Sequence, residues 1–288
     1  MGKAPVERKE SIFNVYREAF MDLLFPLDLS CHICKEPLRE NRKQEGVLHY
    51  EDYLCLTCID EIPWIEEPSC KKCSIPLYRS SANCFETSPD KVRYEEEILR
   101  PLARPKNLCS ECSEDSPLDR NISLCLYEKP IKSAIYAFKY SDKTYIARIF
   151  ALMMASKIRS LPKDEQNFDL ILSVPLHKKR LRHRGYNQSD LLAKHLSKEL
   201  QIPYDSKALS RIKETRIMNQ LSKSQRIQNV QDAFFLKNNQ NNLKKAKKIL
   251  LIDDIYTTGA TAKSIAEALK KQGAAHITML SIARVVLK

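Results

Sequence analysis

The segment ILLIDDIYTTGAT, residues 249–261, is the most informative part of this 288-residue chain. Its four leading apolar residues predict a buried central strand of a parallel sheet. Asp253 and Asp254 come at the end of that strand, and a short Thr/Gly loop then leads directly into a helix. Because open α/β sheets bind ligands at the carboxyl ends of their strands, this order predicts a binding site.

The Thr/Gly loop has the composition of an anion site. Its backbone N–H groups, with the N-terminus of the helix behind them, suit a phosphate dianion. Thr257, Thr258 and Thr261 add hydroxyl donors, and Gly259 allows the backbone to approach the anion closely. Since two acids would repel a phosphate, we expect them to hold a hydroxyl-rich group such as ribose, or a Mg²⁺ shared with the ligand. The alternative without a ligand is an acidic turn before a capped helix.

The surrounding sequence has the pattern of an α/β domain. Short apolar runs predict further strands, and apolar residues at helical spacing predict helices between them. The expected strands span 122–127, 168–174, 248–253 and 277–285, and the expected helices span 131–158, with a break near 140–143, 187–200 and 261–272. Gly273 is expected to end the last helix. This alternation predicts a parallel sheet with helices on both faces.

A basic segment follows the strand at 168–174. Five cations occur there within seven residues: Lys178, Lys179, Arg180, Arg182 and Arg184. The whole stretch from His177 to Arg226 holds thirteen Lys/Arg against four Asp/Glu, which favours polyanions. We expect the loop after this strand to lie beside the Thr/Gly loop, so its cations can contact a pyrophosphate. The alternative is a solvated basic turn.

The polar stretch from Lys213 to Phe234 has few core positions. We interpret it as a mobile flap that closes over the ligand, with Gln220 and Arg226 as its candidate contact residues. An ordinary surface connection is the alternative.

These segments resemble known proteins. Residues 249–261 resemble the motif of type I phosphoribosyltransferases that binds 5-phosphoribosyl-1-pyrophosphate (PRPP). The resemblance implies that Asp253 and Asp254 contact the ribose hydroxyls. It also implies that the 5′-phosphate is held by Thr257, Thr258, Gly259, Ala260 and Thr261. VPLH at 174–177, RGYNQ at 184–188 and the Thr215-to-Phe234 pattern are similar to the ComF (competence protein F) family. The family implies a type I phosphoribosyltransferase-like α/β domain that binds PRPP with Mg²⁺.

Cysteines indicate metal in the N-terminal half. Eight of the ten cysteines form four Cys-x-x-Cys pairs: Cys31/Cys34, Cys55/Cys58, Cys70/Cys73 and Cys109/Cys112. Two such pairs make a tetrahedral Zn²⁺ site, so four pairs predict two zinc ribbons that stabilise a region poor in apolar runs. Pairing in sequence order is simplest, but Cys55/Cys58 with Cys70/Cys73 is an alternative, and Cys84 could replace a ligand. Cys125 is expected in the core.

We therefore expect a helical extension at 1–27, a double zinc-ribbon region at 28–120 and a phosphoribosyltransferase-like domain at 121–288. No stretch approaches eighteen apolar residues and no signal-peptide pattern is present, so a cytoplasmic protein without membrane insertion is expected.

Two functions remain open from the sequence. One is an enzyme that transfers ribose 5-phosphate from PRPP to a nitrogen acceptor, or PRPP binding coupled to DNA uptake. The other is a non-catalytic accessory protein of natural transformation. The family resemblance implies that this second kind of protein binds single-stranded DNA alongside a helicase-like competence protein.

Overall fold

The computed structural model of the protein describes residues 30–38, 49–77, 107–141, 143–212, 234–236, 243 and 245–286. The expected helical extension at 1–27, Cys84 and the flap residues Gln220 and Arg226 lie outside these ranges. Tertiary contacts divide the chain into two compact units, Met1–Asp60 and Glu61–Lys288. The second cysteine tetrad thus groups with the α/β part, whereas the sequence placed a boundary near residue 120; the three-part division stays a prediction.

The first unit holds a short 3₁₀ helix, η1 (Tyr50–Tyr53), and one turn of helix, α2 (Leu56–Asp60). A β-bridge joins Ser30 to Pro37 and closes a tight turn around the first Cys-x-x-Cys pair. The ring of Tyr53 is buried and lies edge-on to His32, with ring centroids 5.7 Å apart. Among the residues of this unit that the structure describes, the buried apolar side chains are those of Tyr53 and Leu54, together with Cys31 and Cys58.

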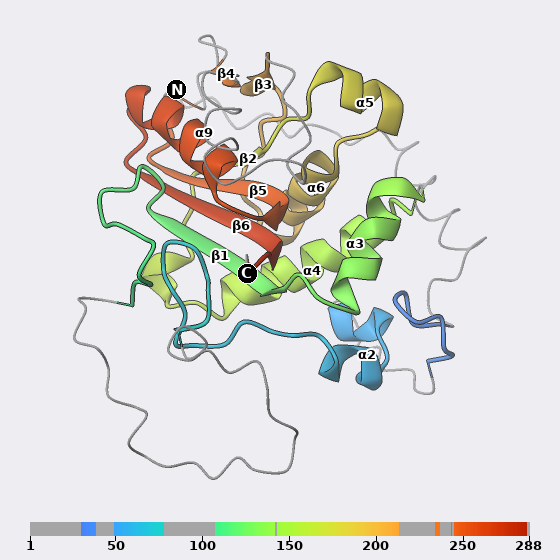
Figure 1. The fold of residues 1–288 in the computed structure, drawn as a ribbon. Helices are drawn as coiled ribbons and strands as arrows, with labels where there is room; N and C mark the ends of the chain where they lie inside the picture. Colours follow the sequence, from blue (N-terminus) through green and yellow to red (C-terminus); the bar gives the residue numbers. More distant parts are fainter. Residues whose placement is uncertain are drawn as a thin grey trace, which may run out of the picture. The chain divides into compact units, whose positions relative to one another are not determined.

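The second unit is built on a four-stranded parallel sheet (Figure 1). Its order is β1 (Arg120–Leu126), β6 (His276–Arg284), β5 (Lys248–Tyr256) and β2 (Leu170–Ser173). All four expected strands are present, and β2 and β5 are direct neighbours with Leu170 opposite Ile249. β5 continues to Tyr256, three residues beyond the expected end, so both acids belong to the strand itself.

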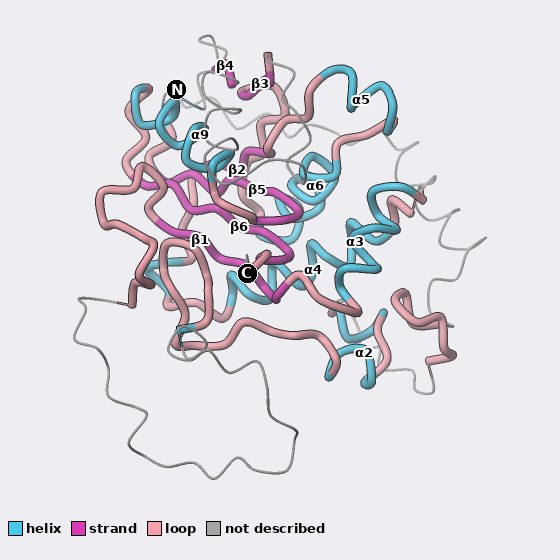
Figure 2. Tube along the Cα trace, viewed as in Figure 1, coloured by secondary structure: helices cyan, strands magenta, loops and turns pink. Residues whose placement is uncertain are grey.

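Helices cover both faces of the sheet, as predicted (Figure 2). The expected helix at 131–158 is two helices, α3 (Ile131–Tyr140) and α4 (Ile146–Arg159), and the break falls where the sequence placed it. α4 packs against α6 (Gln188–Leu200), and these two helices contact the strands from one side. α9 (Ala260–Lys271) lies on the opposite face and ends before Gly273, whose φ of +92° is left-handed.

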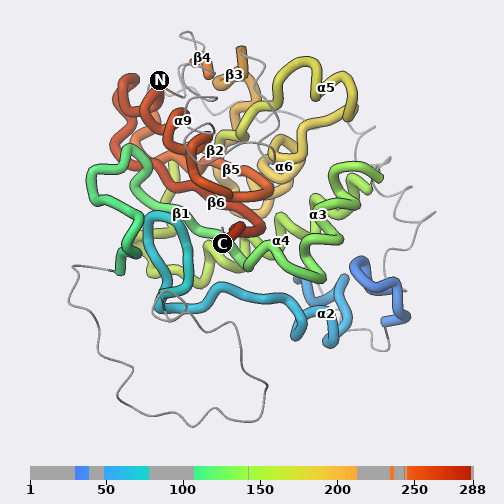
Figure 3. The backbone as a smooth tube through the Cα atoms, viewed as in Figure 1, coloured from blue at the N-terminus to red at the C-terminus, as the bar shows by residue number. Residues whose placement is uncertain are grey.

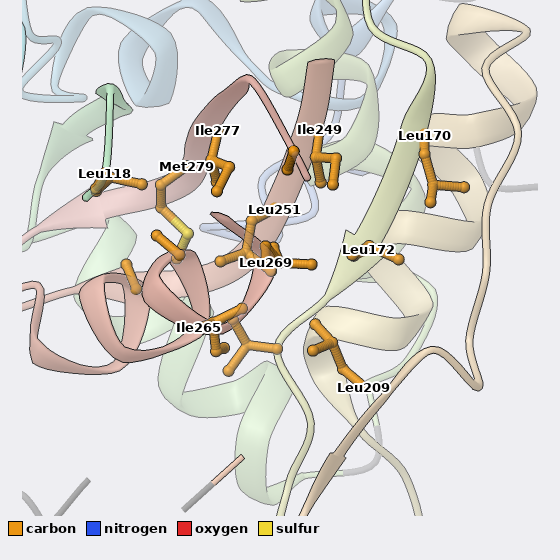
Figure 4. Packing of buried hydrophobic residues seen from close by; sticks show 14 of the residues in the cluster. Leu118, Leu170, Leu172, Leu209, Ile249, Leu251, Ile265, Leu269, Ile277 and Met279 are labelled. Atoms are coloured by element: carbon orange, nitrogen blue, oxygen red, sulfur yellow. The ribbon is translucent and has the colours of Figure 1, made fainter. Parts of the chain in front are cut away.

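Alternating side chains of the strands supply the two cores. On the α9 side, Ile265 and Leu269 pack over Leu251 and its neighbours from β2 and β6 (Figure 4). The residues between them in sequence, such as Ile171 and Leu250, are also fully buried, since they face α4 and α6. A strand that is buried on both faces explains why β5 reads as an unbroken apolar run.

Two features differ from the sequence expectations. The basic segment after β2 is a helix, α5 (Lys178–Arg184), and not a turn. The side chain of His177 caps its first turn, and Gly185, with φ +80°, ends it. A small antiparallel ribbon, β3 (Leu209–Arg211) with β4 (Phe234–Leu236), was not predicted. Figure 3 follows the chain from β2 through α5 into α6 and on to β3.

Within the described residues, none of the helices is long and apolar enough to cross a membrane.

Candidate functional site

A cavity of about 350 Å³ lies at the carboxyl ends of β2 and β5. Residues from five segments of the second unit line it. They include Lys139 from α3, Arg180 and Arg184 from α5, Ser189 from α6, Arg211 from β3, and Asp253, Asp254, Thr257 and Thr261 from β5 and the loop after it. The expected meeting of the two loops at this edge of the sheet is therefore observed.

The two acids at the end of β5 have different partners. Asp254 is 7% exposed as a residue, and its carboxylate forms an ion pair with the Nζ of Lys139 at 2.7 Å. Asp253 accepts a hydrogen bond from the Oγ of Ser189 at 2.8 Å and another from the amide of Asp254 at 3.0 Å. Burial, and then the adjacent charge of Asp254, raise the pKa of Asp253 to about 7. Near neutral pH Asp253 is therefore only partly ionised, which lowers the negative charge of the pair beside Lys139.

The Thr/Gly loop presents only part of its length to the cavity. Thr257 and Thr261 line it, while Thr258, Gly259 and Ala260 do not. Gly259 has φ +75° and is the N-cap of α9, so the loop enters the helix through a left-handed residue. The N-terminus of α9 follows at Ala260, whose amide donates to the Oγ1 of Thr258 at 3.4 Å, so the amides of the first turn of α9 lie beside the loop.

Arg284, the last residue of β6, holds the carbonyl side of this loop. Its guanidinium donates to the carbonyl oxygens of Thr257 and Val285 and lies 5.2 Å from the ring centroid of Tyr256. Arg284 is 8% exposed. A buried cation behind the loop adds positive potential at the proposed anion site.

Of the five cations of α5, two reach the cavity. Arg180 and Arg184 are four residues apart, so they project from the same face of the helix, and both line the cavity. Lys178, Lys179 and Arg182 are exposed and do not line it. The sequence predicted pyrophosphate contacts for these three as well, but their place outside the cavity favours the solvated alternative.

Several lining residues were not singled out from the sequence. Arg211 is 8% exposed, and burial, followed by the charge of Arg180, lowers its pKa to about 10. Helix α3 contributes Lys139, Tyr136 and Tyr140. Its last residue, Tyr140, lies 113 positions before Asp253 in the sequence. Nothing local in the sequence links α3 to the site, because its approach depends on how α3 packs in the folded unit.

The eight paired cysteines form two tetrads, in sequence order. Within each, the sulfur atoms lie within 4.8 Å of one another: Cys31, Cys34, Cys55 and Cys58 in the first unit, and Cys70, Cys73, Cys109 and Cys112 in the second. This excludes the alternative pairing of Cys55/Cys58 with Cys70/Cys73. Cys125 is fully buried in β1 and its thiol donates to the carbonyl of Ile282, as expected of a core cysteine.

Both tetrads fit Zn²⁺ by donor type, number and local geometry. In each first knuckle the chain turns back on itself, with the amide of Lys35 donating to Cys31 and that of Ser74 to Cys70. Burial opposes ionisation of Cys31, but hydrogen bonds from backbone amides, that of Cys55 foremost, lower its pKa to about 7. Four thiols held this close in each tetrad are consistent with two structural zinc sites.

Comparison with known proteins identifies the family. The chain is 32% identical to "Competence protein F" of Haemophilus influenzae over 179 residues, which cover 61% of this chain and 78% of that protein. The chain belongs to the ComF (competence protein F) family. "DNA utilization protein YhgH" of Salmonella typhimurium is 29% identical and is covered to 96% of its length, with 75% of this chain matched. "Competence protein ComFC" of Bacillus subtilis is 24% identical, with coverage of 89% of this chain and 95% of that protein.

Two family models match parts of this ComF chain. The model described as "Double zinc ribbon domain" matches residues 20–88, and "Phosphoribosyl transferase domain" matches residues 187–286. The second match contains the acid pair and the Thr/Gly loop, but neither α3 nor α5. The first contains Cys70 and Cys73 but stops before Cys109 and Cys112, which complete the second tetrad in the structure.

Proposed function

We propose that the cavity binds PRPP or a related ribose phosphate. In this arrangement the carboxylates of Asp253 and Asp254 accept hydrogen bonds from the ribose 2′- and 3′-hydroxyls. The amides of residues 257–261 and the N-terminus of α9 bind the 5′-phosphate. The single observation that carries the proposal is that the acid pair, Thr257 and Thr261 line the same cavity as two arginines of α5.

The charges around the cavity support a ligand with a neutral centre and anionic ends. Near pH 7 the acid pair is balanced by Lys139, so it can accept hydrogen bonds from hydroxyl groups without repelling a nearby phosphate. Arg180, Arg184 and Arg211 gather across the cavity and suit the second phosphate group of PRPP.

Transfer to a nitrogen acceptor is the reaction that this arrangement can support. The nucleophilic nitrogen forms a bond to ribose C1 while the bond from C1 to the pyrophosphate oxygen breaks. The pyrophosphate leaves with the bonding electron pair, and the nitrogen loses its proton to solvent or a base. The contribution of Arg180 would be to stabilise the leaving charge, and that of the acid pair to orient the sugar.

We propose that Mg²⁺ arrives with the polyphosphate ligand. Carboxylate oxygens suit this ion, which is commonly bound by one or two carboxylates together with substrate phosphates. Lys139 lies at Oδ2 of Asp254 and Oδ1 of Asp253 accepts two hydrogen bonds, so the ion would bind the other oxygen of either carboxylate. The ion would neutralise charge on the pyrophosphate.

Isothermal titration calorimetry with PRPP and Mg²⁺ tests the proposal. The wild-type protein should bind, and Asp253→Asn/Asp254→Asn should lose at least about tenfold in affinity, since the amides change the hydrogen bonds offered to the sugar. Arg180→Gln should also weaken binding. Lys178→Gln, which removes an exposed cation from the same helix, is the matched control and should bind PRPP normally. Equal losses in the two α5 variants would point to long-range charge and against a shaped pyrophosphate site.

Binding of single-stranded DNA is a second candidate, favoured by one observation. Lys178, Lys179 and Arg182 form an exposed cationic face on α5, beside the cavity but outside it. The names of the relatives refer to competence and DNA utilization. The affinity of the wild-type protein for a short oligonucleotide should then fall steeply between low and physiological salt. The affinity of the variant Lys178→Gln/Lys179→Gln/Arg182→Gln should fall less over the same range. An affinity that is insensitive to salt would contradict phosphate contacts.

A further inference from the structure

Two tyrosines of α3 stand exposed at the edge of the cavity. Tyr136 and Tyr140 are one helical turn apart, 62% and 59% exposed, with ring centroids 4.9 Å apart. The opposite face of the helix is buried through Ile135 and Phe138, so packing fixes which face carries the tyrosines. Large aromatic rings that are held in place but left open to solvent are available to a ligand.

An arginine from another element extends this surface. The guanidinium carbon of Arg184 lies 5.1 Å from the ring centroid of Tyr140, within the range of a cation–π contact. One Nη of Arg184 donates to the Oε1 of Gln188 at 2.6 Å, which holds the guanidinium in place. Two rings and a planar cation therefore lie together, although α3 and α5 are far apart in the sequence.

This aromatic surface belongs to the same cavity as the sugar-phosphate residues. Tyr136, Tyr140 and Arg184 line it together with Asp253 and Thr257. α3 lies outside the residues that match the phosphoribosyltransferase model, which begin at 187. The lining residues from Gln188 onward thus belong to the matched segment, and the others come from α3, α5 and the loops next to them.

We infer that Tyr136, Tyr140 and Arg184 form a stacking platform for the planar base of a ribonucleotide whose ribose phosphate lies on the acid pair and the Thr/Gly loop. The inference rests on the proposed function, and it names the class of ligand as a nucleoside 5′-monophosphate. Purine and pyrimidine rings stack on tyrosine and on arginine whatever their hydrogen-bonding edge, so the platform predicts tolerance among bases. The acid pair offers partners for both ribose hydroxyls, which favours a ribonucleotide.

The test compares two ligands that differ only in the base. Calorimetry would measure the affinities of ribose 5-phosphate and adenosine 5′-monophosphate for the full chain. The wild-type protein should bind the nucleotide about tenfold or more tightly, as expected for one stacked base. Cytidine 5′-monophosphate should also bind more tightly than ribose 5-phosphate, but by a smaller factor than adenosine 5′-monophosphate.

The variant Tyr136→Ala/Tyr140→Ala should lose this preference while binding ribose 5-phosphate as wild type does. Tyr136→Phe/Tyr140→Phe keeps both rings and should retain the preference. Tyr145→Ala removes another exposed tyrosine, one that does not line the cavity, and should also retain it. Thermal melts of the variants would establish that each is folded.

The possible failures are distinguishable. If ribose 5-phosphate binds but the nucleotide gains nothing, or if the alanine variant keeps the gain, the platform is wrong and the proposed function stands. If neither ligand binds to the wild-type protein, the proposed function is wrong and this inference falls with it.

Discussion

A Cβ atom on Gly259 would collide with the hydroxyl oxygen of Tyr256. The two residues bracket the Thr/Gly loop: Tyr256 ends β5, and Gly259 begins α9. Tyr256 is 3% exposed, and its hydroxyl donates to the carbonyl of Lys72 at 3.5 Å, inside the knuckle of Cys70 and Cys73. The loop therefore packs on the same side chain that contacts the second tetrad.

Replacing Gly259 should disturb the loop more than its backbone conformation alone explains. In Gly259→Ala the alanine would have to adopt a left-handed φ, and its Cβ would collide with the hydroxyl of Tyr256. The substitution should therefore lower the free energy of unfolding by about 2–4 kcal/mol. Gly185→Ala is the matched control, because its φ is +80° but nothing lies within 4 Å of the added atom. It should cost about 1 kcal/mol. Equal costs in denaturant titrations would argue against the contact with Tyr256.

The raised pKa of Asp253 predicts a dependence of stability on pH. Between pH 4 and 7 the folded protein binds a proton that the unfolded chain has released, so the free energy of unfolding falls as pH rises. Asp253→Asn removes this penalty and should stabilise the ligand-free protein by about 1–3 kcal/mol at pH 8, and little at pH 4.

Asp169 supplies a control of opposite sign for the pH experiment. Amides of Lys248 and Lys247 donate to its carboxylate and lower its pKa. Its folded-state pKa lies below that of the unfolded chain, so its contribution is present at neutral pH and is lost on acidification. Asp169→Asn should therefore lower the free energy of unfolding at pH 8. Melting curves in which both variants shift in the same direction would contradict these assignments.

Lys139 should be coupled energetically to Asp254. Its ammonium group is the cation at 2.7 Å from a carboxylate whose side chain is 10% exposed. Lys139→Gln leaves that charge without its partner and should cost about 2–4 kcal/mol at pH 8. Adding Asp254→Asn should recover part of the loss, and a double-mutant cycle measures the coupling. Lys132→Gln, an exposed change on the same helix, should alter stability by no more than about 0.5 kcal/mol.

The two cysteine tetrads should differ in what they stabilise. Cys70, Cys73 and Cys109 belong to the buried cluster that contains Leu251 and Ile265, whereas the first tetrad lies in the other compact unit. Cys70→Ser should lower the melting temperature of the α/β unit by about 10 °C or more. Cys31→Ser should leave hydrogen exchange in β5 and β6 unchanged.

Metal analysis would accompany these two variants. We expect two zinc ions per wild-type chain and one in each variant. A wild-type chain that holds a single zinc, or β5 amides that exchange faster in Cys31→Ser than in Cys70→Ser, would refute the assignment of separate roles.

Much of the α/β architecture was predictable because its signals are local. β5 is an apolar run buried on both faces, and α9 has its start and its end marked by Gly259 and Gly273. The spacing of the cysteines made pairing in sequence order the simplest prediction but left an alternative open, and the positions of the sulfur atoms decide for sequence order. The acid pair and the Thr/Gly loop are contiguous in the chain, so half of the candidate site could be read directly.

The other half depends on contacts between distant segments. α5 has no apolar periodicity, since five of its seven residues are Lys or Arg, and only the spacing of four between Arg180 and Arg184 hinted at a shared face. Lys139 and Tyr140 reach the cavity through the packing of α3, which no local pattern specifies. The strands β3 and β4 have three residues each, too few to show an alternation.

A crystal structure of the protein soaked with PRPP and Mg²⁺ would test the central claim most directly. We predict that the 5′-phosphate lies within hydrogen-bonding distance of the amides of residues 257–261, with the ribose hydroxyls on Asp253 and Asp254. A fully occupied ligand elsewhere, or an empty cavity at saturating PRPP with Asp254 still paired to Lys139, would contradict it.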